Sequence, residues 1–193
     1  LRDGLLARTG SATFTCLSFG EETMNVQRMT DVINQIVEKA PISGLKVKYG
    51  VYENVDKSLP ISVLCDYAAM AGETIMDNYD CDLAYYTEEI AQKRIYNQML
   101  ENSFEDALNN REFILYYQPK IDINTEKVIG AEALVRWKKA DGSMVSPGDF
   151  IPVYESDGLI ERLDEYVFEQ VCHLQKEKMK DGEKLLEISV NLS

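Results

Sequence analysis

The stretch YYQPKIDINTEKVIGAEALVRW, residues 116–137, holds most of what the sequence says about the second half of the chain. Residues 113–118 and 127–138 are each typical of a β-strand. In the second of these strands Glu132 and Arg136 share one face and lie about 13 Å apart, which is too far for a direct ion pair. The residues of the other face are Ala131, Ala133, Val135 and Trp137. The pattern predicts a strand with one buried face and one face that carries two unpaired charges.

Downstream of this stretch the sequence predicts two helices and a further strand. Ser146 is the expected N-cap of the first helix, and Pro147 is its expected first residue. Apolar residues at helical spacing then predict a long amphipathic helix that ends before Asp181, and residues 185–192 are typical of a strand. Strands that alternate with helices predict a parallel β/α architecture, of which the first units are present.

The first half is predicted to be an α+β or α/β sandwich that lacks its beginning. Its predicted elements are two strands within 5–19 around a turn at 9–11, a helix at 25–40, a strand at 45–52, a helix from about 59 to 76 and a strand at 83–86. Ser62 is the expected N-cap of the second helix. Residues 87–111 are polar and contain no Gly or Pro, so they predict a connecting helix rather than a flexible linker.

The charge of the chain restricts its partners. The formal net charge is −13, with 15 acidic and 9 basic residues in 1–103 and 18 acidic and 11 basic residues in 104–193. An acidic excess spread in this way argues against duplex nucleic acid as a partner, because phosphate binding there needs clustered Lys and Arg. A small phosphorylated ligand stays compatible, since a few local cations or metal ions are sufficient to bind it.

Cysteine usage and hydropathy predict a cytoplasmic protein. The four Cys residues form no C-x-x-C pair and are expected to be free thiols, and His173 is expected to be a surface or packing residue. No apolar run reaches the ~18–20 residues that span a membrane, and no signal peptide is present. The start at Leu1 without a Met indicates a piece of a longer protein, whose other parts could include a sensor or a membrane anchor.

Three predicted strands of the second half end in a polar residue, namely Gln118, Glu132 and Asn191. In β/α barrels the side chains at the carboxyl ends of strands line the mouth of the active site. Carboxylate and amide oxygens are hard ligands for divalent cations, and the planar guanidinium of Arg136 suits a phosphate. The pattern alone leaves two interpretations open, a metal and phosphate site or a strand with one solvated face.

The second half resembles the EAL domain, the phosphodiesterase module of cyclic di-GMP signalling. The resemblance runs from about 104 to 193 and rests on four motifs in the family order. These are YYQPKIDINTEKVIGAEALVRW, SPGDFIP, ESDGLI and SVNLS. It implies the first β/α units of a modified TIM barrel, whose usual size is ~250 residues. It also implies hydrolysis of cyclic di-GMP to linear pGpG at a pair of Mg²⁺ or Mn²⁺ ions.

The resemblance also implies roles for single residues. Glu132 would be the metal ligand that gives the family its name, and Asn191 would be a second ligand. Gln118 and Arg136 would face cyclic di-GMP, with Arg136 at a phosphate, and Leu134 would pack near the nucleotide. The family's other metal-binding acids and its general base would come after Ser193, so we expect the 193-residue chain itself not to hydrolyse cyclic di-GMP.

The first half resembles, more weakly, the GGDEF domain of diguanylate cyclases. The family motif of two glycines, two acids and Phe would lie in the predicted turn near residue 10. Gly10 and Phe14 match it, whereas Ser11 replaces the second glycine and Ala12 and Thr13 replace the two acids. Neither side chain can bind Mg²⁺ as a carboxylate does. We therefore expect a degenerate domain at 1–86 without cyclase activity.

The expected organisation is this degenerate domain, a connecting helix at 87–103, and the N-terminal part of an EAL domain at 104–193. The expected function of the whole protein is cyclic di-GMP hydrolysis, with the first domain in a regulatory role. The alternatives are a module that senses cyclic di-GMP or GTP without cutting it, and a pure interaction module. The sequence leaves open whether the protein forms a homodimer.

Overall fold

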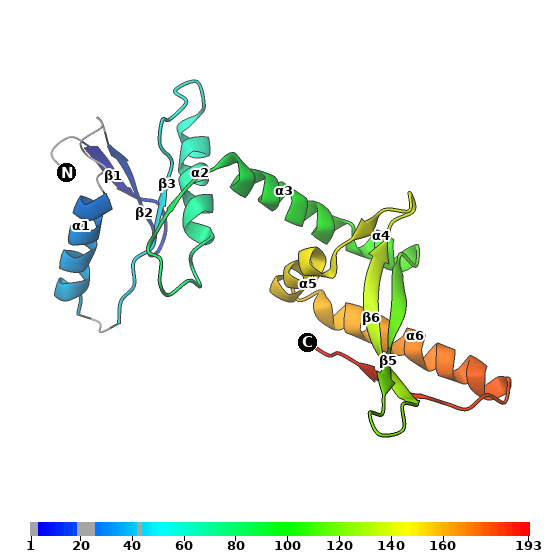
Figure 1. Cartoon of the computed structure of the whole chain (residues 1–193). Coiled ribbons are helices and arrows are strands. Elements are labelled where there is room, and N and C mark those ends of the chain that lie inside the picture. The colour runs from blue at the N-terminus through cyan, green and yellow to red at the C-terminus, as the bar shows by residue number, and fades with distance from the viewer. Residues whose placement is uncertain (1–3, 19–25, 42–43) are drawn as a thin grey trace. The chain divides into compact units, whose positions relative to one another are not determined.

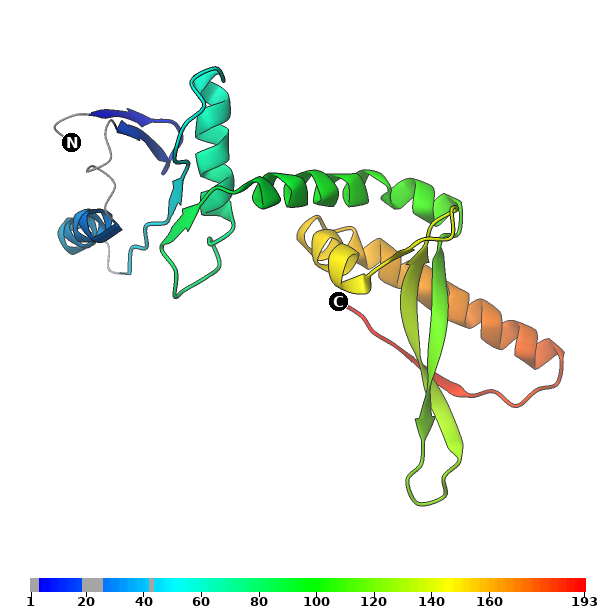
Figure 2. The ribbon, with the colours of Figure 1, turned by 45° about the horizontal axis from the view of Figure 1, so that its top comes forward.

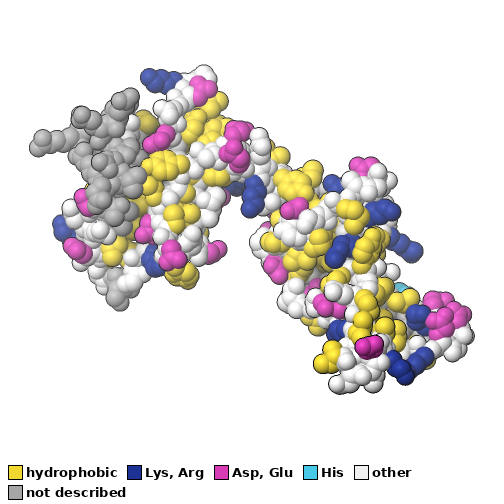
Figure 3. Space-filling model, in the orientation of Figure 1, with side chains coloured by type: hydrophobic (Ala, Val, Ile, Leu, Met, Phe, Trp, Pro, Cys, Tyr) yellow, Lys and Arg dark blue, Asp and Glu magenta, His cyan; other side chains and the backbone are white. Residues whose placement is uncertain are grey.

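The computed structural model describes residues 4–18, 26–41 and 44–193. The chain has a mixed α/β structure and divides into two compact units, Leu1–Gln92 and Lys93–Ser193 (Figure 1). Acidic side chains are distributed over both units in Figure 3, as their even count in the sequence predicts. Within the described residues, no helix combines the length and the hydrophobicity that crossing a membrane requires.

The first unit contains two separate pairs of strands. Strands β1 (Gly4–Arg8) and β2 (Phe14–Ser18) form an antiparallel hairpin, which confirms the strand–turn–strand prediction for this region. Helix α1 (Val26–Lys39) follows and confirms the predicted helix. Strands β3 (Tyr49–Val51) and β4 (Leu83–Tyr85) pair in parallel, so the strand predicted at 45–52 is shorter than expected.

Helix α2 (Ile61–Glu73) connects β3 to β4 and packs directly on β3. The contact is backbone to backbone, because a Cβ atom added to Gly50 would lie 1.8 Å from the carbonyl oxygen of Ala68. The prediction of Ser62 as N-cap is wrong, since Pro60 occupies that position with an extended ψ of 145° and Ser62 lies inside the helix. The carbonyl of Pro60 accepts the first helical hydrogen bonds, so the cap has no side-chain contribution.

The predicted connecting helix is divided in two. Helix α3 (Glu88–Asn102) and helix α4 (Phe104–Asn109) are separated at Ser103. The Ser103 hydroxyl donates to the carbonyl of Met99 at 2.7 Å, a back-bond that weakens the regular helical ladder at this point. The break places Phe104 in the hydrophobic core of the second unit.

The second unit is built on a four-stranded sheet. Strands β5 (Phe113–Ile121) and β6 (Val128–Lys138) form an antiparallel hairpin, the two-residue strand β7 (Met144–Val145) pairs antiparallel with β6, and β8 (Glu187–Val190) pairs parallel with β6. Figure 2 shows the long hairpin with β8 crossing beside it. The parallel β/α prediction is therefore right for β6 and β8 and wrong for β5. A tight turn such as 122–127 can join only antiparallel strands, whereas a parallel connection needs a dozen residues or more.

Two helices make the connection between β6 and β8. Helix α5 (Pro147–Ser156) begins as predicted, because the Ser146 hydroxyl accepts a hydrogen bond from the Gly148 amide at 3.3 Å and Pro147 follows the cap. Helix α6 (Ile160–Lys180) is the long amphipathic helix, and it contacts both β6 and β8. The parallel β6–α5–α6–β8 arrangement thus confirms one predicted β/α unit.

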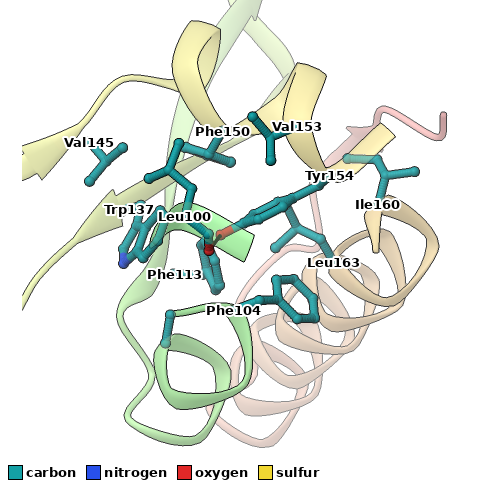
Figure 4. Packing of buried hydrophobic residues seen from close by; sticks show 11 residues of the cluster. Leu100, Phe104, Phe113, Trp137, Val145, Phe150, Val153, Tyr154, Ile160 and Leu163 are labelled. Carbon is teal, nitrogen blue, oxygen red and sulfur yellow. Dashed lines mark hydrogen bonds between the residues drawn. The ribbon is translucent and has the colours of Figure 1, made fainter. Parts of the chain in front are cut away.

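The core of the second unit is rich in aromatic side chains, as the close view in Figure 4 shows. Trp137 and Tyr154 are fully buried at 0% exposure, and each has a hydrogen-bond partner for its polar atom. The Trp137 indole N–H donates to the Glu112 carboxylate at 2.9 Å, and the Tyr154 hydroxyl donates to the Leu100 carbonyl at 3.3 Å. Burial raises the pKa of the Tyr154 hydroxyl, so it stays protonated as a donor. This core anchors one face of β6 and leaves the other face free.

Candidate functional site

Strand β6 has the two faces that the sequence predicts. Ala131, Ala133 and Trp137 are buried at 8%, 3% and 0% exposure, respectively. Glu132 and Arg136 lie on the opposite face and are half-buried. Because neighbouring side chains alternate along a strand, the buried face fixes the direction in which the charged residues point. We call this opposite face of β6, together with the residues of β5 and β8 that are in register with it, the polar face.

The register of the sheet brings residues from three strands together on the polar face. Gln118 of β5 pairs with Glu132 of β6, and Glu132 also pairs with Ser189 of β8. Paired residues of adjacent strands point to the same side of the sheet. Gln118 is exposed, and Leu134 lies half-buried on the same face of β6 as Glu132. The predicted site residues of the second half therefore share one surface.

Glu132 and Asn191 are in direct contact. The side-chain amide of Asn191 donates to Oε1 of Glu132 at 3.0 Å, although 59 positions separate the two residues in the chain. Asn191 directly follows β8, as predicted for a residue at the carboxyl end of a strand. The same prediction is wrong for Glu132 and Gln118, because β6 continues to Lys138 and β5 continues to Ile121. Parallel pairing of β6 and β8 produces the contact.

The Glu132–Asn191 pair fits a hard divalent cation in its chemistry. This hydrogen bond uses the amide nitrogen of Asn191 and Oε1 of Glu132, so it does not involve the second carboxylate oxygen of Glu132 or the amide oxygen of Asn191. Both of these oxygens are ligands of the type that Mg²⁺ and Mn²⁺ prefer. A pair alone supplies only part of a six-coordinate shell. In the part of the chain that the structure describes, no group of three or more His, Cys, Asp or Glu side chains could hold a metal ion.

Arg136 keeps most of its guanidinium available. One of its N–H groups donates to the carbonyl of Val135 at 2.8 Å, and its guanidinium carbon lies 5.8 Å from the centre of the Tyr116 ring. Among the described residues no carboxylate forms an ion pair with it. A guanidinium that is oriented by a ring and has several free donors can bind a phosphate in a bidentate manner.

Sequence reasoning missed two polar residues near this site. Lys120 of β5 donates from Nζ to the hydroxyl of Ser189 at 2.7 Å. Asp164 of α6 accepts the backbone amide of Ser193 at 2.7 Å through Oδ2. The parity of Lys120 with Gln118 was a signal for the first contact. The second contact joins a helix to the chain after β8, and no local pattern predicts it.

The hairpin of the first unit carries the predicted degenerate motif. Gly10, Ser11, Ala12 and Thr13 form the turn between β1 and β2, and Phe14 is the first residue of β2. Residues 4–18 contain no Asp or Glu. The side chain of Arg8 donates to the carbonyl of Gly10 at 3.0 Å and closes the turn on itself. The turn therefore offers no carboxylate for a metal ion.

Comparison with known proteins assigns the second half of the chain. Residues 101–193 match the family described as EAL domain. The bifunctional diguanylate cyclase/cyclic di-GMP phosphodiesterase MucR of Pseudomonas aeruginosa is 35% identical over 94 residues, which are 49% of this chain and 14% of MucR. The probable cyclic di-GMP phosphodiesterase PdeB of Escherichia coli is 42% identical over 66 residues, 34% of this chain and 13% of PdeB.

This chain is also similar to a solved structure of the MucR phosphodiesterase in complex with cyclic di-GMP. The similarity covers 49% of this chain and 38% of the MucR chain, with 35% identity and a TM-score of 0.45. The chain spans about one seventh of the length of the curated relatives MucR and PdeB. The family match identifies residues 101–193 of this chain as an EAL domain sequence.

Proposed function

We propose that the protein acts in bacterial cyclic di-GMP signalling, and that its second unit is the N-terminal part of an EAL barrel that hydrolyses cyclic di-GMP to pGpG. The single observation that carries this proposal is the 3.0 Å contact between Asn191 and Glu132, the two residues that the family resemblance gives as metal ligands. The match of residues 101–193 to the EAL domain supports it independently.

In this proposal each residue of the polar face has a defined task. Glu132 and Asn191 hold a Mg²⁺ or Mn²⁺ ion through their oxygens, and Arg136 binds a phosphate of the dinucleotide. Gln118, opposite Glu132 in register, and Leu134, between Glu132 and Arg136 on β6, contact the nucleotide. The bound metal ions would supply neutralisation of the phosphate charge and an activated water molecule.

Two ligands are too few for a complete metal site, so we propose that the 193-residue chain is itself inactive. A carboxylate and an amide leave most of a six-coordinate shell to water. The chain should bind Mn²⁺ weakly through Glu132 and Asn191, and should bind cyclic di-GMP weakly through Arg136. It should release no pGpG.

For the first unit we propose a GGDEF-like domain at 1–86 that has lost cyclase activity and regulates its neighbour through a helix at 87–103. The support is the turn between β1 and β2, where Gly10 and Phe14 match the family motif and no carboxylate is present. GTP is the candidate ligand of this domain. Calorimetry with millimolar GTP tests this role, and the absence of heat would leave the unit as a scaffold.

A second candidate function is a cyclic di-GMP sensor that binds the nucleotide without cutting it. Among the described residues no group of three or more His, Cys, Asp or Glu side chains could hold a metal ion, and binding without hydrolysis needs no such group. Both functions require Arg136 and Gln118, but only hydrolysis requires the metal. The two are therefore separated by whether binding of cyclic di-GMP depends on a divalent cation.

The deciding experiment is a titration of the 193-residue chain with cyclic di-GMP in the presence and absence of Mn²⁺. We expect Mn²⁺ to strengthen binding and Glu132→Ala to remove that effect. Glu169→Ala is the matched control, because Glu169 is exposed on α6 and outside the polar face. Binding that is equal with and without Mn²⁺ would favour the sensor, and production of pGpG would contradict the proposed inactivity of the chain.

A further inference from the structure

Asn191 lies outside the regular secondary structure, directly after the end of β8. It is exposed and lies one residue beyond β8, a strand of only 4 residues that pairs with β6 along its whole length. Short strands of this kind open easily at their ends. Its contact with Glu132 therefore depends on what holds the chain on either side of it.

Two side chains bind the chain close to Asn191, one on each side of it in the sequence. Lys120 binds the hydroxyl of Ser189, two residues before it, and Asp164 binds the backbone amide of Ser193, two residues after it. We infer that Lys120 and Asp164 are positioning residues that together hold Asn191 against Glu132. This inference deepens the proposed function, because the pair that they position is the proposed metal-binding pair.

The contact of Lys120 with Ser189 spans the sheet. Strands β5 and β8 both pair with residues 130–133 of β6, so they lie on opposite edges of β6. The lysine side chain must therefore cross β6, and the residue in register with Lys120 is Gly130. With no side chain at Gly130, the polar face has room for this crossing.

Gly130 also permits the close approach of β8. A Cβ atom added to Gly130 would lie 2.6 Å from the carbonyl oxygen of Glu187, which is closer than such atoms can approach. The residue that lets β8 pair with β6 is thus the one that leaves space for Lys120. Both effects bring Ser189, and with it Asn191, to a defined position beside Glu132.

Asp164 acts from the other side of the sheet. It lies on α6, whose residues Leu163 and Val167 are buried at 1% and 5% exposure, and Leu163 belongs to the core cluster around Trp137. The carboxylate is therefore attached to a rigid element. Its hydrogen bond to Ser193 stops the chain after β8 from moving away from the sheet, and charge-assisted bonds of this type are among the stronger ones.

The test uses two readouts that need no catalysis. The first is hydrogen exchange of the β8 amides together with the side-chain amide resonance of Asn191, assigned with Asn191→Asp. The second is Mn²⁺ affinity measured by electron paramagnetic resonance. Lys120→Met and Asp164→Ala should each accelerate exchange in residues 188–193 about tenfold and weaken Mn²⁺ binding by a similar factor. Amides of α6 at Val167 and Val171 should keep their protection, which excludes general unfolding.

Conservative variants separate positioning from a loss of packing. Lys120→Arg keeps a cationic donor and Asp164→Asn keeps an oxygen acceptor, so both should restore protection of β8 and the Asn191 resonance. Lys127→Met is the control for removal of one positive charge, because Lys127 is exposed in the turn before β6.

The outcomes are distinct. Unchanged β8 exchange in Lys120→Met and Asp164→Ala would overturn the inference, and so would equal effects of Lys120→Met and Lys120→Arg. If the variants shift β8 exchange and the Asn191 resonance but the wild-type chain does not bind Mn²⁺, the positioning role is supported and the proposed metal function fails.

Discussion

The two antiparallel hairpins of this chain, β1–β2 and β5–β6, differ in what lies against them. In β1–β2 the apolar side chains of Leu5, Leu6 and Phe14 are 67%, 65% and 62% exposed. In β5–β6 one face of β6 is buried on an aromatic core and a third strand, β8, adds to its edge. A buried face fixes the register of a strand, and thereby the positions of the residues on its other face. The polar face of β6 is a defined site for this reason, whereas among the described residues no core covers these apolar side chains of β1–β2, and residues 4–18 contain no carboxylate.

The largest change expected from this comparison is Trp137→Ala. It removes a fully buried indole and should lower the free energy of unfolding of the second unit by about 3–5 kcal/mol. Hydrogen exchange of the Val167 and Val171 amides would measure the loss. Phe14→Ala, in the unanchored hairpin, should change stability by no more than about 0.5 kcal/mol. Similar losses for the two variants would remove the distinction between the hairpins.

The next largest effect is expected for Gly130→Ala. The added Cβ would meet the carbonyl oxygen of Glu187 at 2.6 Å, so β8 must move away from β6 at a cost of about 1–3 kcal/mol. We expect rapid exchange of β8 amides and loss of the Asn191 contact with Glu132, while the aromatic core remains folded.

Gly148→Ala is the matched control for this substitution. A Cβ atom at Gly148 would meet only the Ser146 hydroxyl at 3.6 Å, an ordinary contact distance. The control should therefore be neutral or slightly stabilising. Intact β8 protection in Gly130→Ala would show that the sheet tolerates the extra atom and that the glycine has no role in the polar face.

The sequence predicts what is periodic and local in this chain. Alternation along residues 131–137 gives the two faces of β6, and Ser146 followed by Pro147 gives the start of α5, because each signal lies within a few residues. Strand direction is not periodic, so the antiparallel course of β5 was missed. Its only signal was the short turn at 122–127, which cannot join parallel strands.

Contacts between distant segments were beyond the sequence for a different reason. Lys120 reaches Ser189 across β6, and Asp164 reaches Ser193 from α6, so both contacts depend on how separate elements pack together. Each contact joins residues that lie far apart in the sequence, so no local pattern marks it. Residue types indicated the Glu132 and Asn191 pair, but its 3.0 Å contact required the tertiary structure.

A smaller effect on stability is expected at the helix N-caps, where the prediction of Ser146 for α5 is right and that of Ser62 for α2 is wrong. Ser146→Ala removes the hydroxyl that accepts the Gly148 amide, and it should destabilise α5 by about 1 kcal/mol. Ser62→Ala should cause no loss, because Ser62 lies inside α2 and Pro60 holds the cap position. The midpoints of chemical denaturation would measure both, and a clear loss for Ser62→Ala would restore the original prediction.

The smallest expected effect is the pH dependence of stability at the turn between β5 and β6. Backbone amides of Thr125 and Asn124 donate to the Asp122 carboxylate at 2.9 and 2.8 Å and hold the pKa of that carboxyl below its ordinary 3.8. A lowered folded-state pKa adds stability at pH values above 3.8, and this stability is lost as pH falls below 3.8 through the folded-state pKa. The β1–β2 turn, with no carboxylate in residues 4–18, should show no such transition.

Amide chemical shifts of Asn124 and Thr125 would follow this titration. We expect both to move together as pH falls below 3.8, while the aromatic core keeps its dispersion. Asp122→Asn should make both shifts independent of pH, because the amide oxygen still accepts the two bonds but does not ionise. A titration that persists in Asp122→Asn would mean that another carboxylate controls these two amides. The pH dependence of the β5–β6 turn would then not arise from Asp122.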